Sequence, residues 1–373
     1  MNGFSAADHR HMARALELAA RGLCSTDPNP RVGCVLVSGE AVVGEGFHLR
    51  AGEAHAEVLA LAAAGARARG ATAYVTLEPC NHHGRTPPCS EALIAAGVAR
   101  VVYAGADPNP QVAGGGAARL AAAGIATAAG CLEGPAAALN PGFYSRMRRG
   151  RPWVRLKLAA SLDGRTGLAN GNSQWITGEA ARADVQRLRA RSSAILTGAA
   201  TARRDDPRLT VRDPELTALL GGRVPLRVVL DPRLVLLPSA RIFSEPGPVL
   251  VLTASDAVAE RSALVARGAE VLRLEALVTR DLGAVLAELA RRGVNELLIE
   301  AGARLGGAFI EAGLVDEFIL YLAPQLLGHE AAPLAMLPLL DDLGERWEFR
   351  YADVRQVGTD LRLTLTPLAR EAC

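Results

Sequence analysis

The chain has 373 residues, of which 50% are hydrophobic and 4% aromatic, and its formal net charge at pH 7 is only +2. This length exceeds what one hydrophobic core commonly organises, so we expect two domains. The near balance of acids and bases and the scarcity of aromatic rings argue against a nucleic-acid partner and favour small-molecule substrates. No segment approaches the roughly 18 uninterrupted apolar residues of a membrane span, so we expect no membrane association and a cytoplasmic location. The 6 cysteines form no disulfide-like pattern and fit reduced thiols or metal ligands.

The first part of the chain predicts an α/β domain. A helix begins after Ser5, which forms a capping-box pattern with Asp8, and ends near Gly22. Two valine-rich runs on either side of residues 38–40 predict a β-hairpin. A helix over 54–68, a strand over 71–77, a helix over 87–96 and a strand over 99–105 follow. This alternation predicts a sheet covered by helices.

Residues 132–151 separate the two parts of the chain. They combine prolines, glycines and basic residues without a period, which predicts a linker or a short connecting helix. We therefore place the domains at residues 1–145 and 146–373. The second part restarts with a strand over 153–161, a helix over 178–191 and strands at 193–198, 226–231, 248–254 and 296–302. Alternating residues over 318–324, 347–356 and 361–368 predict antiparallel strands at one edge of a second α/β sheet.

The strongest chemical signal is His55-Ala56-Glu57, followed by Pro79-Cys80 and then Cys89. One imidazole and two thiolates suit zinc, and three protein ligands leave the fourth tetrahedral position for water. Glu57 is placed to move protons between that water, a ring nitrogen and a leaving amine. Thr86 is the expected N-cap of a helix that puts the Cys89 sulfur at a positive helix end. The pattern predicts a zinc-dependent deaminase.

Several alternatives stay open at this point. His82 or His83 could close the zinc site as a fourth ligand, which would make it structural. Asn29, in a Pro-Asn-Pro turn, either points its amide at a base or only forms the turn. The chain could also deaminate transfer RNA or free cytosine, serve as a nucleotide sensor with structural zinc, or keep only one active domain.

The segment LEPCNHHGRTPPC, with HAE and the earlier DPNPRVGCVLV, resembles the deaminase domain of the bifunctional riboflavin biosynthesis proteins. These join a diaminohydroxyphosphoribosylaminopyrimidine deaminase to a 5-amino-6-(5-phosphoribosylamino)uracil reductase. The resemblance implies a cytidine-deaminase-like three-layer domain in which His55, Cys80 and Cys89 hold Zn²⁺ and Glu57 transfers protons. KLAASLDGRTG, NSQWITG and TGAATARRDDPRLTVR resemble the reductase domain, which implies a dihydrofolate-reductase-like α/β fold and NADPH.

Individual reductase contacts rest mainly on this resemblance, because no G-x-G-x-x-G follows a first strand. IEAGARLGGAF offers small residues between a strand and a helix, which fit either a phosphate-binding helix N-terminus or a tight turn. The implied NADPH contacts are Ala159, where the family often has glycine, and Trp175, Thr201, Asp205, Gly302, Ala303, Arg304, Leu305, Gly306, Gly307 and Ala308. The implied substrate contacts are Ser173, Arg189, Leu209, Arg212 and Glu300.

Lys157 is the only lysine in the chain. Codon bias alone explains an arginine-rich composition, but a compact ammonium also suits a reacting group, so Lys157 is a catalytic candidate that stabilises or protonates the sugar oxygen as hydride arrives at C1. Arg189 and Arg212 offer forked donors for a phosphate, although Arg189 lies in an arginine-rich helix whose charges mostly face water. Asp205 fits a capped turn and Trp175 a core aromatic equally well by local rules.

Together these features predict a bifunctional enzyme of riboflavin biosynthesis. Its first domain would remove the pyrimidine 2-amino group by hydrolysis at zinc, and its second would reduce the phosphoribosyl side chain with NADPH. The expected partners are small phosphoribosylaminopyrimidines. The oligomeric state stays open, with a homo-oligomer among the options.

Overall fold

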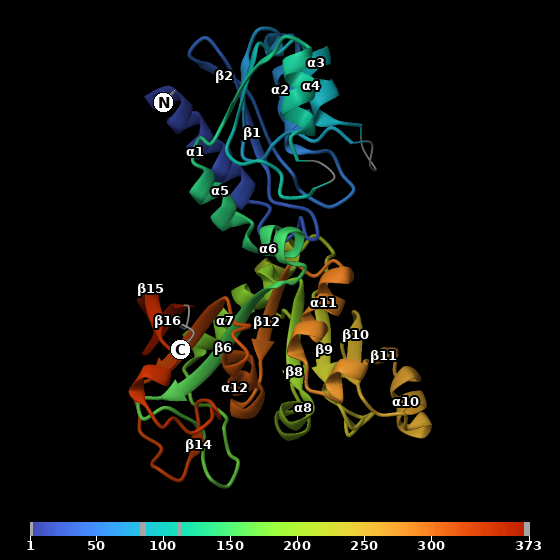
Figure 1. The fold of residues 1–373 in the computed structure, drawn as a ribbon, viewed down its shortest axis with the longest axis vertical. Helices are drawn as coiled ribbons and strands as arrows, with labels where there is room; N and C mark the ends of the chain where they lie inside the picture. Colours follow the sequence, from blue (N-terminus) through green and yellow to red (C-terminus); the bar gives the residue numbers. More distant parts are fainter. Residues whose placement is uncertain (1–2, 83–86, 111–112, 369–373) are drawn as a thin grey trace. The chain divides into compact units, whose positions relative to one another are not determined.

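The structure, a computed structural model, describes residues 3–82, 87–110 and 113–368 (Figure 1). The chain divides into two compact units, Met1–Gly150 and Arg151–Cys373. The predicted linker contains two helices, α5 (Glu133–Leu139) and α6 (Pro141–Arg149), and α6 ends at Gly150 in the left-handed conformation with φ 65°. Each helix is too short to give a clear period in the sequence. The expected boundary between residues 145 and 146 lies inside α6. The two compact units instead meet just after this helix, between Gly150 and Arg151.

The first unit is built on a five-stranded sheet with the strand order β2-β1-β3-β4-β5. β1 pairs antiparallel with β2 and β3, whereas β3, β4 and β5 are parallel. The strands are β1 (Gly33–Ser38), β2 (Ala41–Phe47), β3 (Thr72–Val75), β4 (Arg100–Tyr103) and β5 (Ala126–Ala129). The predicted hairpin is confirmed, and Gly39 supplies its turn with a φ of 61°.

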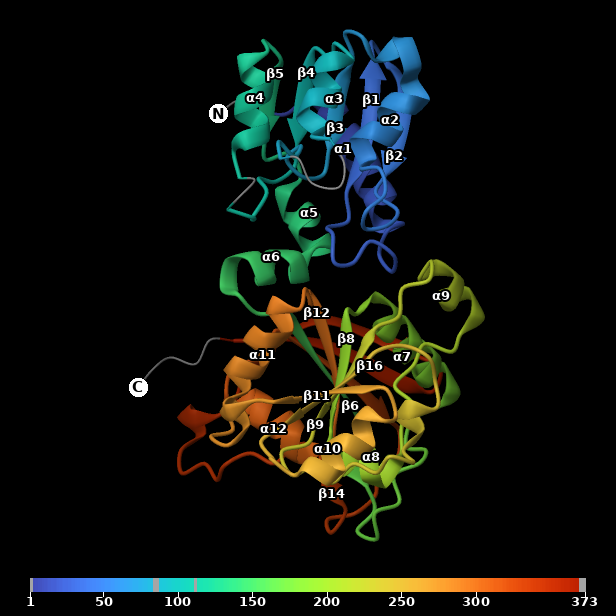
Figure 2. The same ribbon diagram turned by 90° about the vertical axis from the view of Figure 1, so that its right-hand side faces the viewer.

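Helices cover both faces of this sheet. They are α1 (Ala6–Ala20), α2 (Ala56–Ala64) with a 3₁₀ turn at Gly65–Ala68, α3 (Cys89–Ala95) and α4 (Gly115–Ala122). Buried residues of α2, α3 and α4 pack on one face, and those of α1 and α5 pack on the other (Figure 2). The predicted capping box of α1 is confirmed, because the Asp8 N–H donates to Ser5 Oγ and the Ser5 N–H donates to Asp8 Oδ2.

The second unit is built on a nine-stranded sheet with the order β11-β10-β9-β8-β12-β6-β13-β16-β15. The strands from β11 to β13 in this spatial order pair in parallel. β16 and β15 continue the sheet as antiparallel strands, as predicted for one edge. The strands are β6 (Trp153–Ser161), β8 (Ala194–Gly198), β9 (Leu226–Leu230), β10 (Val249–Thr253), β11 (Ala269–Arg273), β12 (Glu296–Glu300), β13 (Glu317–Ala323), β15 (Phe349–Val357) and β16 (Asp360–Pro367). A separate two-stranded sheet pairs β7 (Arg165–Gly167) with β14 (Ala332–Pro333).

Helices again lie on both faces. They are α7 (Glu179–Arg191), α8 (Ala199–Asp205), α9 (Pro214–Leu219), α10 (Val258–Val265), α11 (Leu282–Arg291) and α12 (Ala303–Glu311), with 3₁₀ turns at Arg241–Phe243, Glu275–Leu277 and Leu343–Glu345. Core residues of α11 and α12 pack on one face of the sheet, and those of α7, α8 and α10 pack on the opposite face.

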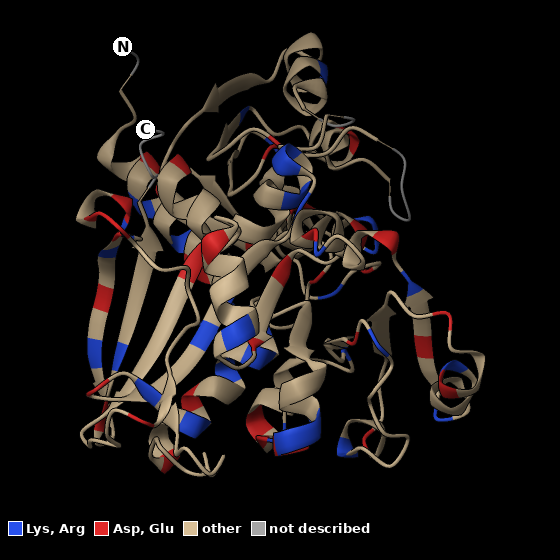
Figure 3. Ribbon diagram, turned by 60° about the horizontal axis from the view of Figure 1, so that its bottom comes forward, with Lys and Arg blue, Asp and Glu red and all other residues tan. Residues whose placement is uncertain are grey.

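Ion pairs accommodate charged side chains inside this sheet. Arg155 of β6 is 1% exposed and is hydrogen-bonded to Glu296 of β12 and Glu317 of β13. A buried charge is tolerated when it has an oppositely charged partner, as Arg155 has here. These two ion pairs link β6 to the strands on either side of it. Acidic and basic segments are interspersed over the ribbon (Figure 3). In the described part of the chain, the helices are all too short or too polar to cross a membrane.

Candidate active sites

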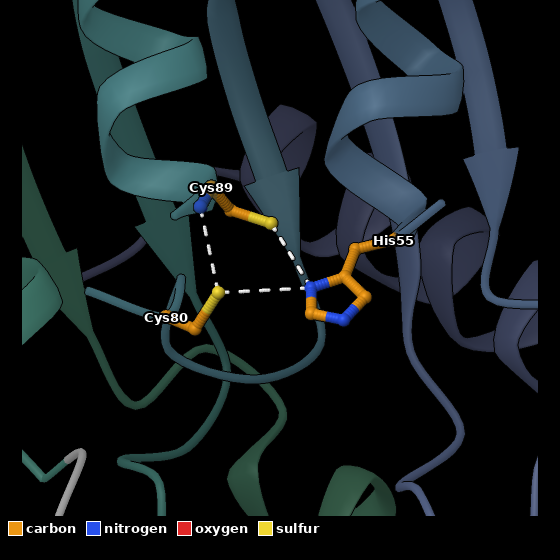
Figure 4. A group of neighbouring side chains, drawn as sticks. All are labelled: His55, Cys80 and Cys89. Carbon is orange, nitrogen blue, oxygen red and sulfur yellow. Dashed lines mark hydrogen bonds between the residues drawn. The ribbon is translucent and has the colours of Figure 1, made fainter. Parts of the chain in front are cut away.

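Two helix starts and one loop bring His55, Cys80 and Cys89 together in the first unit. His55 is the N-cap residue of α2, Cys89 is the first residue of α3, and Cys80 lies in the loop between β3 and α3. Their candidate ligand atoms all lie within 4.8 Å of one another. The Nδ1 atom of the His55 ring faces both sulfurs (Figure 4). Thr86, the expected N-cap of α3, lies outside the described residues, and Pro88 occupies the N-cap position.

Hydrogen bonds couple the two thiols to each other and to His55. His55 Nδ1 lies 3.2 Å from Cys89 Sγ and 3.6 Å from Cys80 Sγ, and the Cys89 N–H donates to Cys80 Sγ at 3.4 Å. A hydrogen bond from the Cys89 thiol, helped by His55 and this N–H, lowers the pKa of Cys80 to about 4. The same thiol hydrogen bond, together with burial, raises the pKa of Cys89. The pair therefore holds one thiolate beside an imidazole nitrogen, which is a ready environment for a divalent cation.

The donor set fits zinc. One imidazole nitrogen and two sulfurs from separate elements converge, and three ligands leave room for water in a tetrahedral site. His82 is exposed and is not part of this cluster, and His83 lies outside the described residues. Within the described residues the geometry is thus that of an open site with three protein ligands.

Glu57 lies in the first turn of α2, two residues after His55. It is 4% exposed, and burial followed by the charge of Cys80 raises its pKa to about 6, while His55 and a hydrogen bond from Cys89 act in the opposite direction. A carboxylate with a pKa near neutrality both accepts and releases protons at physiological pH. Its position beside the cluster therefore suits proton transfer.

His48 was not singled out from the sequence, but it packs against the cluster. Its ring centroid lies 5.2 Å from that of His55, at right angles to it. His48 Nδ1 lies 3.1 Å from the Ala54 carbonyl oxygen and Nε2 lies 3.0 Å from the Asn29 amide nitrogen. These partners require Nδ1–H as donor and Nε2 as acceptor, so the ring is neutral, and burial lowers its pKa in agreement. Asn29 thus uses its amide to orient a histidine.

A second Asp-Pro-Asn-Pro segment, residues 107–110, also lies near the cluster and was missed from the sequence. Asp107 is 9% exposed, and burial raises its pKa to about 6, with further contributions from the Glu78 and Cys80 charges. Glu78 holds the following loop, since its carboxylate accepts the N–H groups of Asp107, Gly114 and Ala117. The repeat of the tetrapeptide at residues 27–30 was the available signal.

In the second unit, predicted cofactor residues lie at the carboxyl ends of three neighbouring parallel strands. Ala159 is near the end of β6, Thr201 is in the first turn of α8 after β8, and Gly302 is the N-cap residue of α12 after β12. The Gly302 N–H donates to Thr201 Oγ1 at 3.1 Å, which joins two of these ends. Ligands of open α/β sheets bind at this edge.

The glycines of α12 have a packing role. A Cβ on Gly307 would lie 2.1 Å from the Met336 carbonyl oxygen, whereas one on Gly306 would lie 3.6 Å from Leu156 Cδ1. Both glycines are buried, so the close approach at Gly307 is to the backbone of the protein itself. Of the remaining predicted turn residues, Arg304 is exposed, and Ala303, Leu305 and Ala308 are partly buried.

Of the predicted contacts Ser173, Trp175 and Asp205, only Ser173 and Asp205 touch each other. Ser173 Oγ donates to Asp205 Oδ1 at 3.4 Å, and Asp205 also accepts a hydrogen bond from Arg204 at 2.9 Å. Trp175 is 68% exposed, and the Arg182 guanidinium lies 4.7 Å from its ring centroid. Trp175 is therefore a surface aromatic and not the core residue that local rules allowed.

Lys157, Arg189 and Glu300 form one charged group around β6 and β12. Lys157 and Glu300 are register partners, and Arg189 of α7 donates to both Glu300 oxygens at 2.6 and 2.9 Å. Burial lowers the pKa of Lys157, with Arg189 acting in the same direction and Glu300 opposing. Within the described residues its ammonium makes no hydrogen bond or ion pair, and its nearest aromatic contact is the Tyr321 ring, 5.8 Å away. Its donors are thus available to a ligand.

Leu209 and Arg212 belong to the segment after α8. Leu209 is 3% exposed, so its side chain anchors the segment in the core. Its backbone is in the left-handed region, with a φ of 53°. Arg212 is exposed and its N–H donates to Gln186 Oε1 at 2.8 Å. Its charge nonetheless acts on the Arg189–Glu300 pair, because Arg212 helps to lower the pKa of Glu300 and Arg189 helps to lower the pKa of Arg212.

Comparison with known proteins gives these sites a family. Residues 5–105 match the cytidine and deoxycytidylate deaminase zinc-binding region, and residues 152–363 match the RibD C-terminal domain. The chain is 50% identical over 365 residues to the riboflavin biosynthesis protein RibD of Escherichia coli K12, covering 96% of this chain and 99% of that protein. It belongs to the RibD family.

Solved RibD structures support the same assignment. RibD of Acinetobacter baumannii is 46% identical, with a TM-score of 0.90 over 97% of this chain and 99% of that chain. A Thermotoga maritima diaminohydroxyphosphoribosylaminopyrimidine deaminase/5-amino-6-(5-phosphoribosylamino)uracil reductase is 32% identical, with a TM-score of 0.85 over 97% and 99%. The predicted fold class, a deaminase-like unit followed by a reductase unit, is confirmed.

Proposed function

We propose that this RibD-family chain catalyses two steps of riboflavin biosynthesis. The first unit hydrolytically removes the 2-amino group of 2,5-diamino-6-(5-phosphoribosylamino)pyrimidin-4(3H)-one, and the second reduces 5-amino-6-(5-phosphoribosylamino)uracil with NADPH. The observation that carries this proposal is an open His55-Cys80-Cys89 cluster beside buried Glu57, in a chain similar throughout to RibD proteins. A cytoplasmic location fits the free thiols of the described cysteines.

In the deaminase step, His55, Cys80 and Cys89 would hold zinc. Bound zinc lowers the pKa of a water ligand from 15.7 to about 7, which makes hydroxide available at neutral pH. Glu57 would accept a proton from the attacking water and deliver protons to the ring nitrogen and the departing amine. The water oxygen would bond to C2 and the exocyclic C2–N bond would break, so that a carbonyl forms and ammonia leaves. The neutral His48 ring is hydrogen-bonded to Asn29 and packs edge-on against the His55 ring, so it helps to hold the His55 side chain in position.

In the reductase step, bound NADPH would supply the hydride for C1 of the opened ribose, and the protein would supply the one proton that completes the reduction. Lys157 is the proposed donor toward the sugar oxygen, because its ammonium is available and lies beside the paired Glu300. Ala159, Thr201 and the start of α12 line the same edge of the sheet and are proposed to contact NADPH. Ser173, a proposed substrate contact, donates a hydrogen bond to Asp205, a proposed NADPH contact.

Product analysis by mass spectrometry tests both steps. Zinc-loaded protein is given the diaminopyrimidine substrate with and without NADPH, in parallel with Glu57→Gln and with Glu53→Gln as control. Glu53 is an exposed acid in the turn before His55. We expect deamination without NADPH, reduction only with it, and loss of deamination alone in Glu57→Gln. Absence of both products from the native protein would refute the proposed function.

A further inference from the structure

Lys157 lies on the face of the reductase sheet that α7 covers. Its strand, β6, runs between β12 and β13, and Lys157 is the register partner of Glu300 in β12. Two residues further along β6, and so on the same face, Ala159 is the register partner of Tyr321 in β13. Ala159 and Tyr321 pack against buried residues of α7, and Lys157 Nζ lies 5.8 Å from the centre of the Tyr321 ring. The lysine side chain therefore has an acid on one side and an aromatic ring on the other.

Tyr321 is held in place by a hydrogen-bond network as well as by packing. It is fully buried, and its hydroxyl donates to Asp184 Oδ2 of α7 at 2.6 Å. Arg362, the register partner of Tyr321 in β16, donates to the same oxygen at 2.9 Å. Burial and the hydrogen bond to Asp184 raise the pKa of Tyr321, so its hydroxyl stays protonated and remains a donor. The network thus keeps a neutral ring in a fixed place beside Lys157.

Helix α7 holds both neighbours of Lys157. Its Asp184 accepts the hydrogen bond from Tyr321. Its Arg189, later in the same helix, donates to both carboxylate oxygens of Glu300. With Glu300 engaged in this way, the lysine ammonium makes no hydrogen bond or ion pair among the described residues. The aromatic ring is therefore the neighbour that is left to hold the ammonium.

An electron-rich ring suits an ammonium group that must stay free to bind a ligand. The face of an aromatic ring is negative and attracts a cation that lies within about 6 Å of its centre. This attraction favours the charged form of Lys157 without using any of its N–H donors. It also restricts a flexible side chain that could otherwise adopt several rotamers. The ring therefore both keeps the proton on the lysine and limits where its ammonium can point.

We propose that Tyr321 is a positioning residue for Lys157, and that its ring, held by Asp184 and Arg362, keeps the ammonium directed toward the sugar oxygen of the reductase substrate. This inference rests on the proposed function, in which Lys157 donates the proton to that oxygen. Because the ring is fully buried, it acts through the lysine and not on a ligand directly. A change in the electron distribution of the ring alone should therefore alter the ammonium and leave ligand binding unchanged.

Lysine labelling reads the ammonium directly, because Lys157 is the only lysine in the chain. Isotope-labelled lysine gives the full-length, zinc-loaded protein a single ε-carbon NMR signal, and its titration reports the pKa of Lys157 without turnover. Two rings of nearly the same shape are compared at position 321, phenylalanine (Tyr321→Phe) and pentafluorophenylalanine. Fluorination withdraws electrons from the face of the ring and so removes its attraction for a cation.

The pentafluoro ring should lower the pKa of Lys157 by about one pH unit relative to Tyr321→Phe, because the charged form loses its attraction to the ring. The other groups that face the lysine or the ring are the same in both proteins, so their effects cancel in this comparison. They are Glu300 of β12, Arg189 and Asp184 of α7, and Arg362 of β16. Equal pKa values with the two rings would overturn the proposal.

Reduction of supplied deaminated intermediate with NADPH adds the functional readout. The decline of kcat at alkaline pH should move to lower pH by the same amount, since the proton donor must be charged. At a pH above both midpoints kcat should therefore be about tenfold lower with the pentafluoro ring, and KM for both ligands should stay within about twofold. The same two rings at Tyr351, which is 65% exposed in β15, are the matched control and should give equal pH profiles. An alkaline limb that does not move between the two rings at position 321 would contradict the positioning role.

Comparison of Tyr321→Phe with the native protein separates the ring from its hydroxyl bond. The ring remains and Asp184 keeps Arg362 as its partner, so kcat should fall by no more than about threefold. A loss in Tyr321→Phe as large as in the pentafluoro protein would exclude the ring as the positioning group. Failure of the native protein to reduce the intermediate would refute the proposed function, whereas the NMR titration would still decide whether the ring acts on Lys157.

Discussion

Gly306 and Gly307 are adjacent in α12, and alanine at each should have opposite effects. Alanine removes the backbone freedom of glycine inside a helix, which stabilises by about 0.5–1 kcal/mol. At Gly306 the new methyl would have its nearest neighbour at 3.6 Å, an ordinary contact. Gly306→Ala should therefore raise the free energy of unfolding by up to about 1 kcal/mol.

At Gly307 the methyl would lie 2.1 Å from the carbonyl oxygen and 2.8 Å from the carbonyl carbon of Met336, so this backbone must move. The Met336 N–H donates to the Ala303 carbonyl oxygen at 3.0 Å, and the movement would strain that bond. Overpacking typically costs about 1–3 kcal/mol. After the helix gain is subtracted, Gly307→Ala should destabilise the reductase unit by about 1–2 kcal/mol.

Scanning calorimetry with and without NADPH measures both effects, because NADPH identifies the reductase transition by shifting it. A unit of this size should lose about 2–4 °C in Tm for each kcal/mol. Equal Tm values for the two variants would refute the packing argument.

The KM for NADPH distinguishes packing from cofactor binding at these glycines. If backbone N–H groups at these glycines bound the cofactor phosphates closely, Gly306→Ala would raise KM without loss of stability, whereas packing predicts an unchanged KM.

Three other outcomes are expected. Removal of zinc by a chelator should abolish deamination but not reduction of supplied intermediate, and added zinc should restore it, as product analysis would show. Lys157→Arg should lower the reductase kcat at least about tenfold with deamination unchanged, because the wider guanidinium must fit beside the Arg189–Glu300 pair. For Asp8, burial favours the neutral form, but hydrogen bonds from Arg100, Ser5 and Tyr74 lower its pKa overall. This stabilisation is present above the unfolded pKa near 4 and is lost as pH falls toward the folded value, so Asp8→Asn should cost about 1–3 kcal/mol in urea unfolding at pH 7, and the difference should shrink below about pH 4.

The deaminase cluster could be predicted because its residues are tied to local signals. His55 and Glu57 lie in one helix start, and Cys89 begins the next helix after a proline pair. The histidine that packs against the cluster could not be found in this way. Asn29 was a candidate, but its partner His48 lies in another loop 19 residues away, and neither loop has a periodic pattern. Only the fold brings such residues together.

The reductase contacts were harder for the same reason. Arg189 and Glu300 are 111 residues apart. A sequence pattern cannot show that the Arg189 guanidinium, which was expected to bind phosphate, is hydrogen-bonded to the Glu300 carboxylate. The glycines of α12 were interpreted through the strand and helix next to them. The close neighbour of Gly307 is Met336, in a segment without regular structure. Helix and strand periods describe faces of elements, and they carry no information about which distant loop covers a face.

Lys157 shows how composition and space combine. Only one of the 41 Lys and Arg residues is lysine. This lysine lies in strand β6, where Arg155 on the same face is satisfied by two carboxylates. At Lys157 the neighbouring Glu300 already accepts two bonds from Arg189. A guanidinium there would bring five N–H donors to an engaged carboxylate, whereas an ammonium brings three and can direct them to a ligand. Because the acid is neutralised by Arg189, the charge of Lys157 remains available for the substrate oxygen.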